Sequence, residues 1–198
     1  MYPKTILNLI ECFKKFPGVG EKSAERMALS CLNLDNETIK LFINSLEDSK
    51  TKITKCEKCG NLSEEKECSI CQSKDRDSQV LCVVEESKNI VLFEKIGTFK
   101  GKYHVLNGLI SPLDGINPED INIAKLIERI EEENIKEIIL AVKPTVEGET
   151  TALYIRKLLE GKNIIISKIA HGIPIGADMD YVDPLTLEIA LSQRSQIS

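Results

Sequence analysis

The sequence lacks any long apolar run. Its longest runs, residues 80–84 and 138–142, have five residues each, whereas a helix that spans a membrane needs about 20. The first residues also lack the apolar stretch of a signal peptide, because Asn8 and Glu11 interrupt it. With 198 residues and 42% hydrophobic side chains, the chain is expected to be a globular cytoplasmic protein without a membrane partner.

Histidine is scarce, and positive charge is in deficit. The two histidines, His104 and His171, are too few and too far apart to suggest acid–base catalysis, so each is expected to be a hydrogen-bonded structural residue. The net charge is −5, yet residues 1–80 contain 13 basic and 13 acidic side chains. The whole deficit therefore lies in residues 81–198, and a polyanion would have to be bound by local basic clusters in the first half.

Apolar periodicity divides the chain into three zones. Residues 3–48 have the spacing of three helices, the second marked by apolar residues from Ala24 to Leu32 and the third expected from about residue 36 to 46. Residues 49–77 are polar and too poor in aliphatic side chains to form a core. Later, strands at 80–84, 103–106, 136–142 and 163–169 alternate with helices at 88–96, 119–133 and 149–159. This α/β pattern predicts a parallel sheet covered on both faces.

A glycine-rich turn separates the first two helices. Gly18 and Gly20 allow a tight turn whose N–H groups point outward, and a helix begins directly after it. Lys22 and Arg26 lie four residues apart on the polar face of that helix. This combination suits phosphate binding, and the segment resembles the helix-hairpin-helix motif, which grips nucleic-acid backbones without reading sequence. The alternative is a structural turn beside a solvated basic face.

The cysteines are the strongest signal in the sequence. Four of the seven form two Cys-x-x-Cys pairs with eight residues between them: Cys56, Cys59, Cys68 and Cys71. Two such pairs place four thiolates around one Zn²⁺, and they leave no open position for a substrate. A redox dithiol needs only one pair, and iron–sulfur clusters usually have other spacings. We therefore predict one structural zinc ion, with the lone Cys12, Cys31 and Cys82 as small core residues.

Acidic residues follow two of the predicted strands. Glu85 and Glu86 come after strand 80–84, and Glu147 and Glu149 come after strand 136–142, so all four could meet at the carboxyl edge of the sheet and hold Mg²⁺. The layout resembles a Toprim domain, in which a Glu and an Asp-x-Asp bind the catalytic metal. Here Glu147-Gly148-Glu149 replaces the Asp-x-Asp, and the Asp-x-Asp at 178–180 follows the wrong strand. The sequence therefore makes Mg²⁺ doubtful and predicts no catalytic residue.

Taken together, these features resemble the RecR family of bacterial recombination mediators over nearly the whole chain. The matching runs are residues 16–28, the two cysteine pairs, and residues 103–116, 144–152 and 171–176. The departures are small: Ala177 stands where a second Gly is usual, and Asp180 where Glu is usual. The resemblance implies a chain divided into a helix-hairpin-helix domain (1–52), a four-Cys zinc finger (53–77), a Toprim domain (78–177) and a C-terminal oligomerisation segment (178–198).

The resemblance also implies a function. RecR-like proteins act with RecF and RecO to load the RecA recombinase at single-stranded gaps, and they form dimers and tetrameric rings with the hairpin domains around DNA. Lys22 and Arg26 match the DNA-contacting positions, and the acidic Toprim face would bind partner proteins. The expected protein is thus a non-enzymatic, nucleoid-associated DNA clamp. The alternatives are a Toprim metal-dependent nuclease or primase-like enzyme, and a zinc-ribbon regulator that binds only protein.

Overall fold

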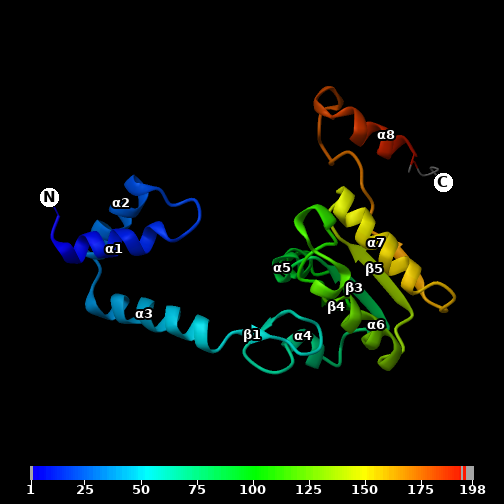
Figure 1. Ribbon diagram of the computed structural model, residues 1–198, viewed down its shortest axis with the longest axis horizontal. Helices are drawn as coiled ribbons and strands as arrows, with labels where there is room; N and C mark the ends of the chain where they lie inside the picture. Colours follow the sequence, from blue (N-terminus) through cyan, green and yellow to red (C-terminus); the bar gives the residue numbers. More distant parts are fainter. Residues whose placement is uncertain (1, 193, 195–198) are drawn as a thin grey trace. The chain divides into compact units, whose positions relative to one another are not determined.

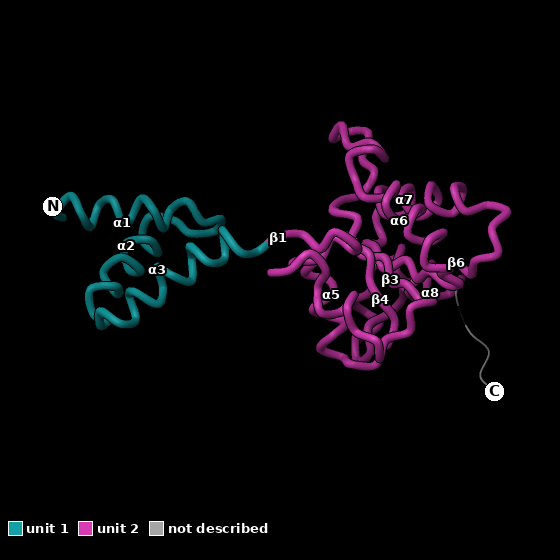
Figure 2. Tube along the Cα trace, turned by 90° about the horizontal axis from the view of Figure 1, so that it is seen from below, with its two compact units in different colours: residues 1–53 teal, residues 54–198 magenta. Residues whose placement is uncertain are grey.

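The computed structural model describes residues 2–192 and residue 194 (Figure 1). The chain forms two compact units, residues 1–53 and residues 54–198 (Figure 2). No helix among the described residues is both long and apolar enough to cross a membrane.

The first unit consists of three helices. The helices α1 (Lys4–Lys14) and α2 (Glu21–Cys31) pack together through Ile6 and Ile10 on one side and Ala24 and Ala28 on the other. The two small alanines, both fully buried, let the helix backbones approach closely. α3 (Asn36–Thr51) begins at the N-cap Asp35, whose carboxylate accepts a hydrogen bond from the Thr38 N–H at 2.7 Å.

α3 continues five residues beyond the end that the sequence predicts. Residues 47–51 contain no Gly or Pro, and the hydroxyls of Ser49 and Thr51 donate to backbone carbonyls of the preceding turn at 2.9 and 2.8 Å. The helix has no buried residue, although Leu41, Phe42, Ile43 and Leu46 give it an apolar side.

The second unit begins with the cysteine-rich segment. Two short antiparallel strands, β1 (Thr54–Lys55) and β2 (Leu62–Ser63), precede the single-turn helix α4 (Ser69–Gln72). Ile70 of α4 packs both against the cysteine cluster and against the hydrophobic core of the following sheet. We call residues 54–77 the zinc module.

Four parallel strands form the sheet of the second unit, in the order β4-β3-β5-β6. Figure 1 labels the first three of them. Their bounds are β3 (Val80–Val84), β4 (Lys102–Val105), β5 (Glu137–Ala141) and β6 (Ile165–Lys168). Helices α6 (Ile123–Glu132) and α7 (Val146–Leu158) contribute to the core on one face, and α5 (Ser87–Ile96) to the core on the other. The predicted parallel α/β sheet, covered on both faces, is confirmed.

Two predicted helices have different bounds. The helix expected at 119–133 is divided into a 3₁₀ turn, Pro118–Asp120, and α6, because Ile121 is extended and buries its side chain in the core. α7 begins at Val146 rather than at residue 149, since the Thr145 hydroxyl accepts a hydrogen bond from the Gly148 N–H at 3.3 Å. Gly148 is required here, because a Cβ would lie 1.9 Å from the Lys143 carbonyl oxygen.

The prediction for the lone cysteines is correct for one of the three. Cys82 is buried in β3, but Cys31 is only half-buried and Cys12 is exposed. Cys12 lies off the face of α1 that carries Ile6 and Ile10. A unit with so small a core leaves even its apolar thiols accessible.

His104 has the predicted structural role. Its Nε2 lies 2.9 Å from the Asn122 carbonyl oxygen, and burial lowers the pKa of the ring to about 4. The ring is therefore neutral at physiological pH. For His171 the prediction is not supported, because its buried Nε2 has no hydrogen-bond partner in the part of the chain that the structure describes.

The C-terminal segment adds a 3₁₀ turn (Met179–Tyr181) and α8 (Pro184–Ser192). None of its described residues from Gly172 to Ser192 is buried, although α8 is mainly apolar. Residues 193 and 195–198 of the predicted oligomerisation segment lie outside the described residues.

Candidate nucleic-acid interface and zinc centre

The turn between α1 and α2 has the backbone geometry of a tight hairpin. Gly18 has a φ of +81°, which residues other than glycine rarely adopt, and Gly20 is the extended N-cap of α2. The Gly20 carbonyl oxygen accepts the first helical hydrogen bond from the Ala24 N–H at 2.9 Å. No heavy atom comes within 4 Å of a Cβ built on either glycine, so the turn is open for a ligand to approach.

Lys14 closes the hairpin from the side of α1. Its ammonium group lies 2.8 Å from a Glu11 oxygen and 2.7 Å from a Glu21 oxygen, so that it joins the end of α1 to the first turn of α2. These hydrogen bonds, with Glu11 the larger influence, raise the pKa of Lys14. Lys14 is thus held by two carboxylates, and it stabilises the turn itself.

Lys22 and Arg26 differ from Lys14. Both side chains are exposed on α2, and in residues 2–192 and 194 neither makes an ion pair or a hydrogen bond. Lys22 lies in the first turn of the helix, where unpaired N–H groups and the helix dipole favour an anion. Two cations that are unpaired among the described residues thus lie on the helix that starts at the hairpin; we call them uncommitted.

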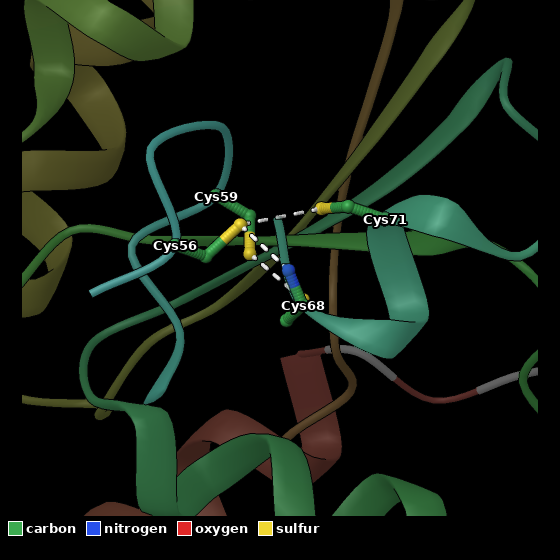
Figure 3. A group of neighbouring side chains, drawn as sticks. All are labelled: Cys56, Cys59, Cys68 and Cys71. Atoms are coloured by element: carbon green, nitrogen blue, oxygen red, sulfur yellow. Dashed lines mark hydrogen bonds between the residues drawn. The ribbon is translucent and has the colours of Figure 1, made fainter. Parts of the chain in front are cut away.

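The four cysteines of the zinc module come together in space (Figure 3). Their Sγ atoms all lie within 4.8 Å of one another, with Cys59 and Cys68 separated by 3.6 Å and Cys56 and Cys71 by 3.9 Å. Zn–S bonds of about 2.3 Å in a tetrahedron require sulfur atoms about 3.8 Å apart. The donor set and its spacing therefore fit one tetrahedral zinc ion.

Local hydrogen bonds shape the first cysteine turn. The Gly60 N–H donates to the Cys56 carbonyl oxygen at 2.9 Å, and Gly60 has a φ of +76°. The Cys68 N–H donates to Cys56 Sγ at 3.3 Å, which links the two cysteine pairs before any metal is considered. All four side chains are at most 4% exposed, so water has little access to the sulfur atoms.

A hydrogen bond between two of the thiols shifts their pKa values in opposite directions. The bond with Cys59 lowers the pKa of Cys68, and the same bond raises the pKa of Cys59. Cysteine binds a metal as the thiolate, so metal binding displaces the protons that these thiols share.

The acidic residues after β3 and β5 do not converge. Glu85 pairs with Lys143 at 2.9 Å, Glu86 with Lys88 at 2.6 Å, and Glu149 with Lys168 at 2.9 Å. Glu147 is stabilised instead by a hydrogen bond with the Thr145 side chain, which lowers its pKa. Among the described residues, the four cysteines are the one group of His, Cys, Asp and Glu side chains close enough to share a metal ion.

Sequence reasoning missed the two lysines at this edge. Lys143 lies two residues after the end of β5 and Lys168 ends β6, so both lie at the carboxyl ends of strands, as the glutamates were predicted to do. Their position after apolar runs could have predicted that they lie at the same sheet edge as the glutamates. The pairings themselves join residues 58 and 19 positions apart and depend on the strand order.

Fold and site together define a class of protein: a chain that joins a helical hairpin unit with an open phosphate-sized turn to a four-Cys metal centre and a parallel α/β domain. Family models match the chain as the RecR helix-hairpin-helix at residues 6–50 and the RecR zinc finger domain with four cysteines at 53–73. Further matches are the Toprim domain at 79–170 and the RecR C-terminal region at 172–195.

Similar proteins cover the full chain. "Recombination protein RecR" of Staphylococcus saprophyticus is 44% identical over 99% of both chains, and that of Natranaerobius thermophilus is 42% identical over 99% of this chain and 98% of its own. The protein of the same name from Staphylococcus haemolyticus is 44% identical over 99% of both chains. The chain belongs to the RecR family, and its four cysteines form the centre for one structural zinc ion.

Proposed function

We propose that this protein is a non-enzymatic DNA-binding mediator of recombinational repair that binds DNA without reading its sequence. The observation that carries the proposal is the hairpin site, where open backbone N–H groups at Gly18 and Gly20 adjoin the uncommitted cations Lys22 and Arg26. Such groups bind phosphate and carry no base information. Because the net charge is −5, this local site has to supply the attraction that the whole chain does not.

The proposed task is to help RecF and RecO load RecA at single-stranded gaps. This part of the proposal rests on membership of the RecR family, since the similar proteins are named recombination proteins. The acidic Toprim face of Glu85, Glu86, Glu147 and Glu149 is proposed to bind the partner proteins. Its carboxylates are balanced by Lys88, Lys143 and Lys168, which suits a charged docking surface better than a magnesium site.

The second candidate, a Toprim nuclease or primase-like enzyme, needs carboxylates that converge on Mg²⁺. The ion pairs of Glu85 and Glu149 with separate lysines of the sheet edge argue against it. The experiment that separates the two functions uses a labelled gapped duplex with and without Mg²⁺, followed by gel-shift and denaturing gels.

We expect the Glu147→Gln variant to shift this DNA like the parent protein and to bind a partner protein less tightly. The substitution removes one exposed charge from the acidic face and leaves the hairpin unit unchanged. Glu131→Gln, which neutralises an exposed carboxylate elsewhere in the second unit, is the matched control. Magnesium-dependent cleavage by the parent protein that disappears in Glu147→Gln would contradict the proposed function.

We further propose that the protein is a homo-oligomer, a dimer or a tetrameric ring. Two segments support this: α3 has an apolar side but no buried residue, and the described part of the C-terminal segment likewise buries no side chain. Tyr181, Leu185 and Leu191 are 89%, 64% and 68% exposed. Apolar surface of this extent is characteristic of subunit contacts. The boundaries 1–52, 53–77, 78–177 and 178–198 stay the proposed division into functional parts.

The oligomer prediction is tested by shortening the chain. We expect deletion of residues 181–198 to lower the mass measured by light scattering, because the deletion removes the apolar residues that would pack on a second subunit. The double substitution Tyr181→Ser with Leu185→Ser should act in the same direction, whereas Glu188→Gln on the same helix should leave the mass unchanged. An unchanged mass after the deletion would exclude this segment from the subunit interface.

A further inference from the structure

The zinc module helps to cover the β4 edge, one of the two edges of the sheet. β4 is an edge strand, and its outward backbone groups are occupied by residues from other elements. The Val105 N–H donates to the Cys59 carbonyl oxygen at 2.8 Å, and the Gly101 carbonyl oxygen accepts from Arg76 at 3.1 Å. The Tyr103 carbonyl oxygen accepts from Arg129 at 2.6 Å. An uncovered edge strand would be open to pairing with another chain, so this cover has a clear physical benefit.

Two buried cations lie at this junction. Lys102 of β4 is 8% exposed, and its ammonium group donates to the carbonyl oxygen of Cys71, itself one of the four thiol residues, at 3.0 Å. Within the described residues Lys102 has no carboxylate partner. A buried lysine without a negative partner is rare, because desolvation of its charge is costly.

Arg129 of α6 is the second buried cation, at 4% exposure. Its Nη1 donates to Tyr103 and its Nε donates to Glu133 at 2.9 Å, but its buried Nη2 has no partner in the described part of the chain. A buried guanidinium N–H without an acceptor is costly, so a negative charge nearby would stabilise it. Arg129 also lines the groove formed with Glu57 and Lys58, which lie between the first two cysteines.

The charges at the junction balance a loaded zinc site. Four thiolates and one Zn²⁺ together carry two negative charges. Lys58, Lys102 and Arg129 are positive, and Glu133, which pairs with both Lys58 and Arg129, is negative. The surplus is two positive charges. The other charged residues of the adjacent groove are exposed and screened by water: Glu57, Lys125, Glu128 and Glu132.

We propose that Lys102 and Arg129 are the counter-cations of the four-cysteine zinc centre, so that the bound metal fastens the zinc module to the β4 edge of the sheet. The two side chains are positioning residues outside the ligand set. Such outer partners typically change metal affinity by about 10–100-fold when they are replaced. The zinc ion thereby stabilises the junction between the module and the sheet as well as the module.

The test measures how fast the full-length zinc protein transfers its metal to excess chelator under reducing conditions. We expect Lys102→Met and Arg129→Met to accelerate the transfer about tenfold or more. Lys100→Met removes an exposed cation two residues before Lys102, and Lys125→Met removes one from the helix that carries Arg129. Both variants should leave the rate within about twofold of the parent. Parental rates in both buried-cation variants would overturn the proposal.

Glu133→Gln separates charge from structure. The glutamine keeps an acceptor for Arg129 and Lys58 but increases the positive surplus, so we expect slower zinc transfer. If Arg129 only held the strand edge, Glu133→Gln would leave the transfer rate at the parental value or raise it, and either result would also overturn the proposal. Because Glu133→Gln is isosteric, it tests the counter-cation role even if Arg129→Met does not fold. Lys102 is proposed to lie outside the ligand set, so Lys102→Met should keep the sulfur-to-metal absorption bands of the cobalt-substituted protein. Loss of one of these bands would likewise contradict a counter-cation role.

Discussion

The double variant Lys22→Ala with Arg26→Ala is expected to lose DNA binding at moderate salt, while its zinc content and oligomer mass stay unchanged. Both side chains are exposed and uncommitted among the described residues, and they lie on α2 directly after the open hairpin. With a net charge of −5 the chain has little long-range attraction for DNA, so the proposed DNA binding depends on local phosphate contacts at these two residues. In an oligomer several weak hairpins act on one DNA molecule, which multiplies the effect of the substitution.

The measurement is a salt titration of duplex binding. Each neutralised phosphate contributes roughly −0.9 to the slope of log K against log salt concentration. The slope of the double variant should therefore be shallower by about two for each subunit that contacts the DNA. Lys4→Ala with Lys40→Ala removes the same charge from exposed positions of the same unit, and should keep most of the parental slope. Parental salt dependence in the Lys22/Arg26 variant would mean that the hairpin is a structural turn and that DNA binds elsewhere.

The Cys59→Ser variant is expected to lose zinc and to unfold the zinc module, while the core of the sheet persists. The module is held by its four sulfur atoms, and apart from the half-buried Ile70 the cluster has no large apolar side chain among the described residues. Structural zinc supplies about 10–16 kcal/mol of apparent folding free energy in zinc-finger peptides, so losing one ligand removes most of what holds residues 54–77. The larger sheet core, which includes Leu81, Leu126 and Ile138, does not include the module.

Elemental analysis and hydrogen exchange measure this result. Exchange should accelerate in residues 54–77 and at the Val105 N–H, which loses its acceptor on Cys59 when the module opens. Cys12→Ser makes the same chemical change at an exposed lone thiol and should retain the metal. Less than about half a zinc ion per chain in parent protein purified without chelator would refute the zinc assignment.

Local features of the protein were predictable because neighbours along the chain determine them. The cysteine spacing predicted the zinc centre, since each Cys-x-x-Cys turn needs only a few adjacent residues, and the first is aided by a glycine with positive φ. The periodicity of Ala24 and Ala28 predicted the buried face of α2, and the apolar run 80–84 predicted β3 with its bounds. The sheet followed from the alternation of strands and helices.

Other features could not be read from the sequence because competing local signals were close in energy. Residues 47–51 are compatible with helix or loop, and hydroxyl contacts in the last turns of α3 favour helix. Ile121 fits a helical pattern, yet burial of its side chain in the sheet core interrupts the predicted helix. Cys12 is of a type usually buried, but the small first unit has too little core to cover it.

The tertiary structure alone decided which charges meet. Glu85 and Lys143 are 58 residues apart and pair because β3 and β5 lie side by side in parallel register. Glu85 and Glu149, for which the sequence left a shared magnesium ion doubtful, are each bound to a separate lysine. Lys102 and Cys71 are 31 residues apart and meet because the zinc module packs along β4. The sequence by itself determined the ligands of the zinc and the cations of the hairpin, since both are local. The ion pairs at the sheet edge and the cations around the zinc centre could be identified only in the folded structure, because the strand order brings residues together that are distant in the sequence.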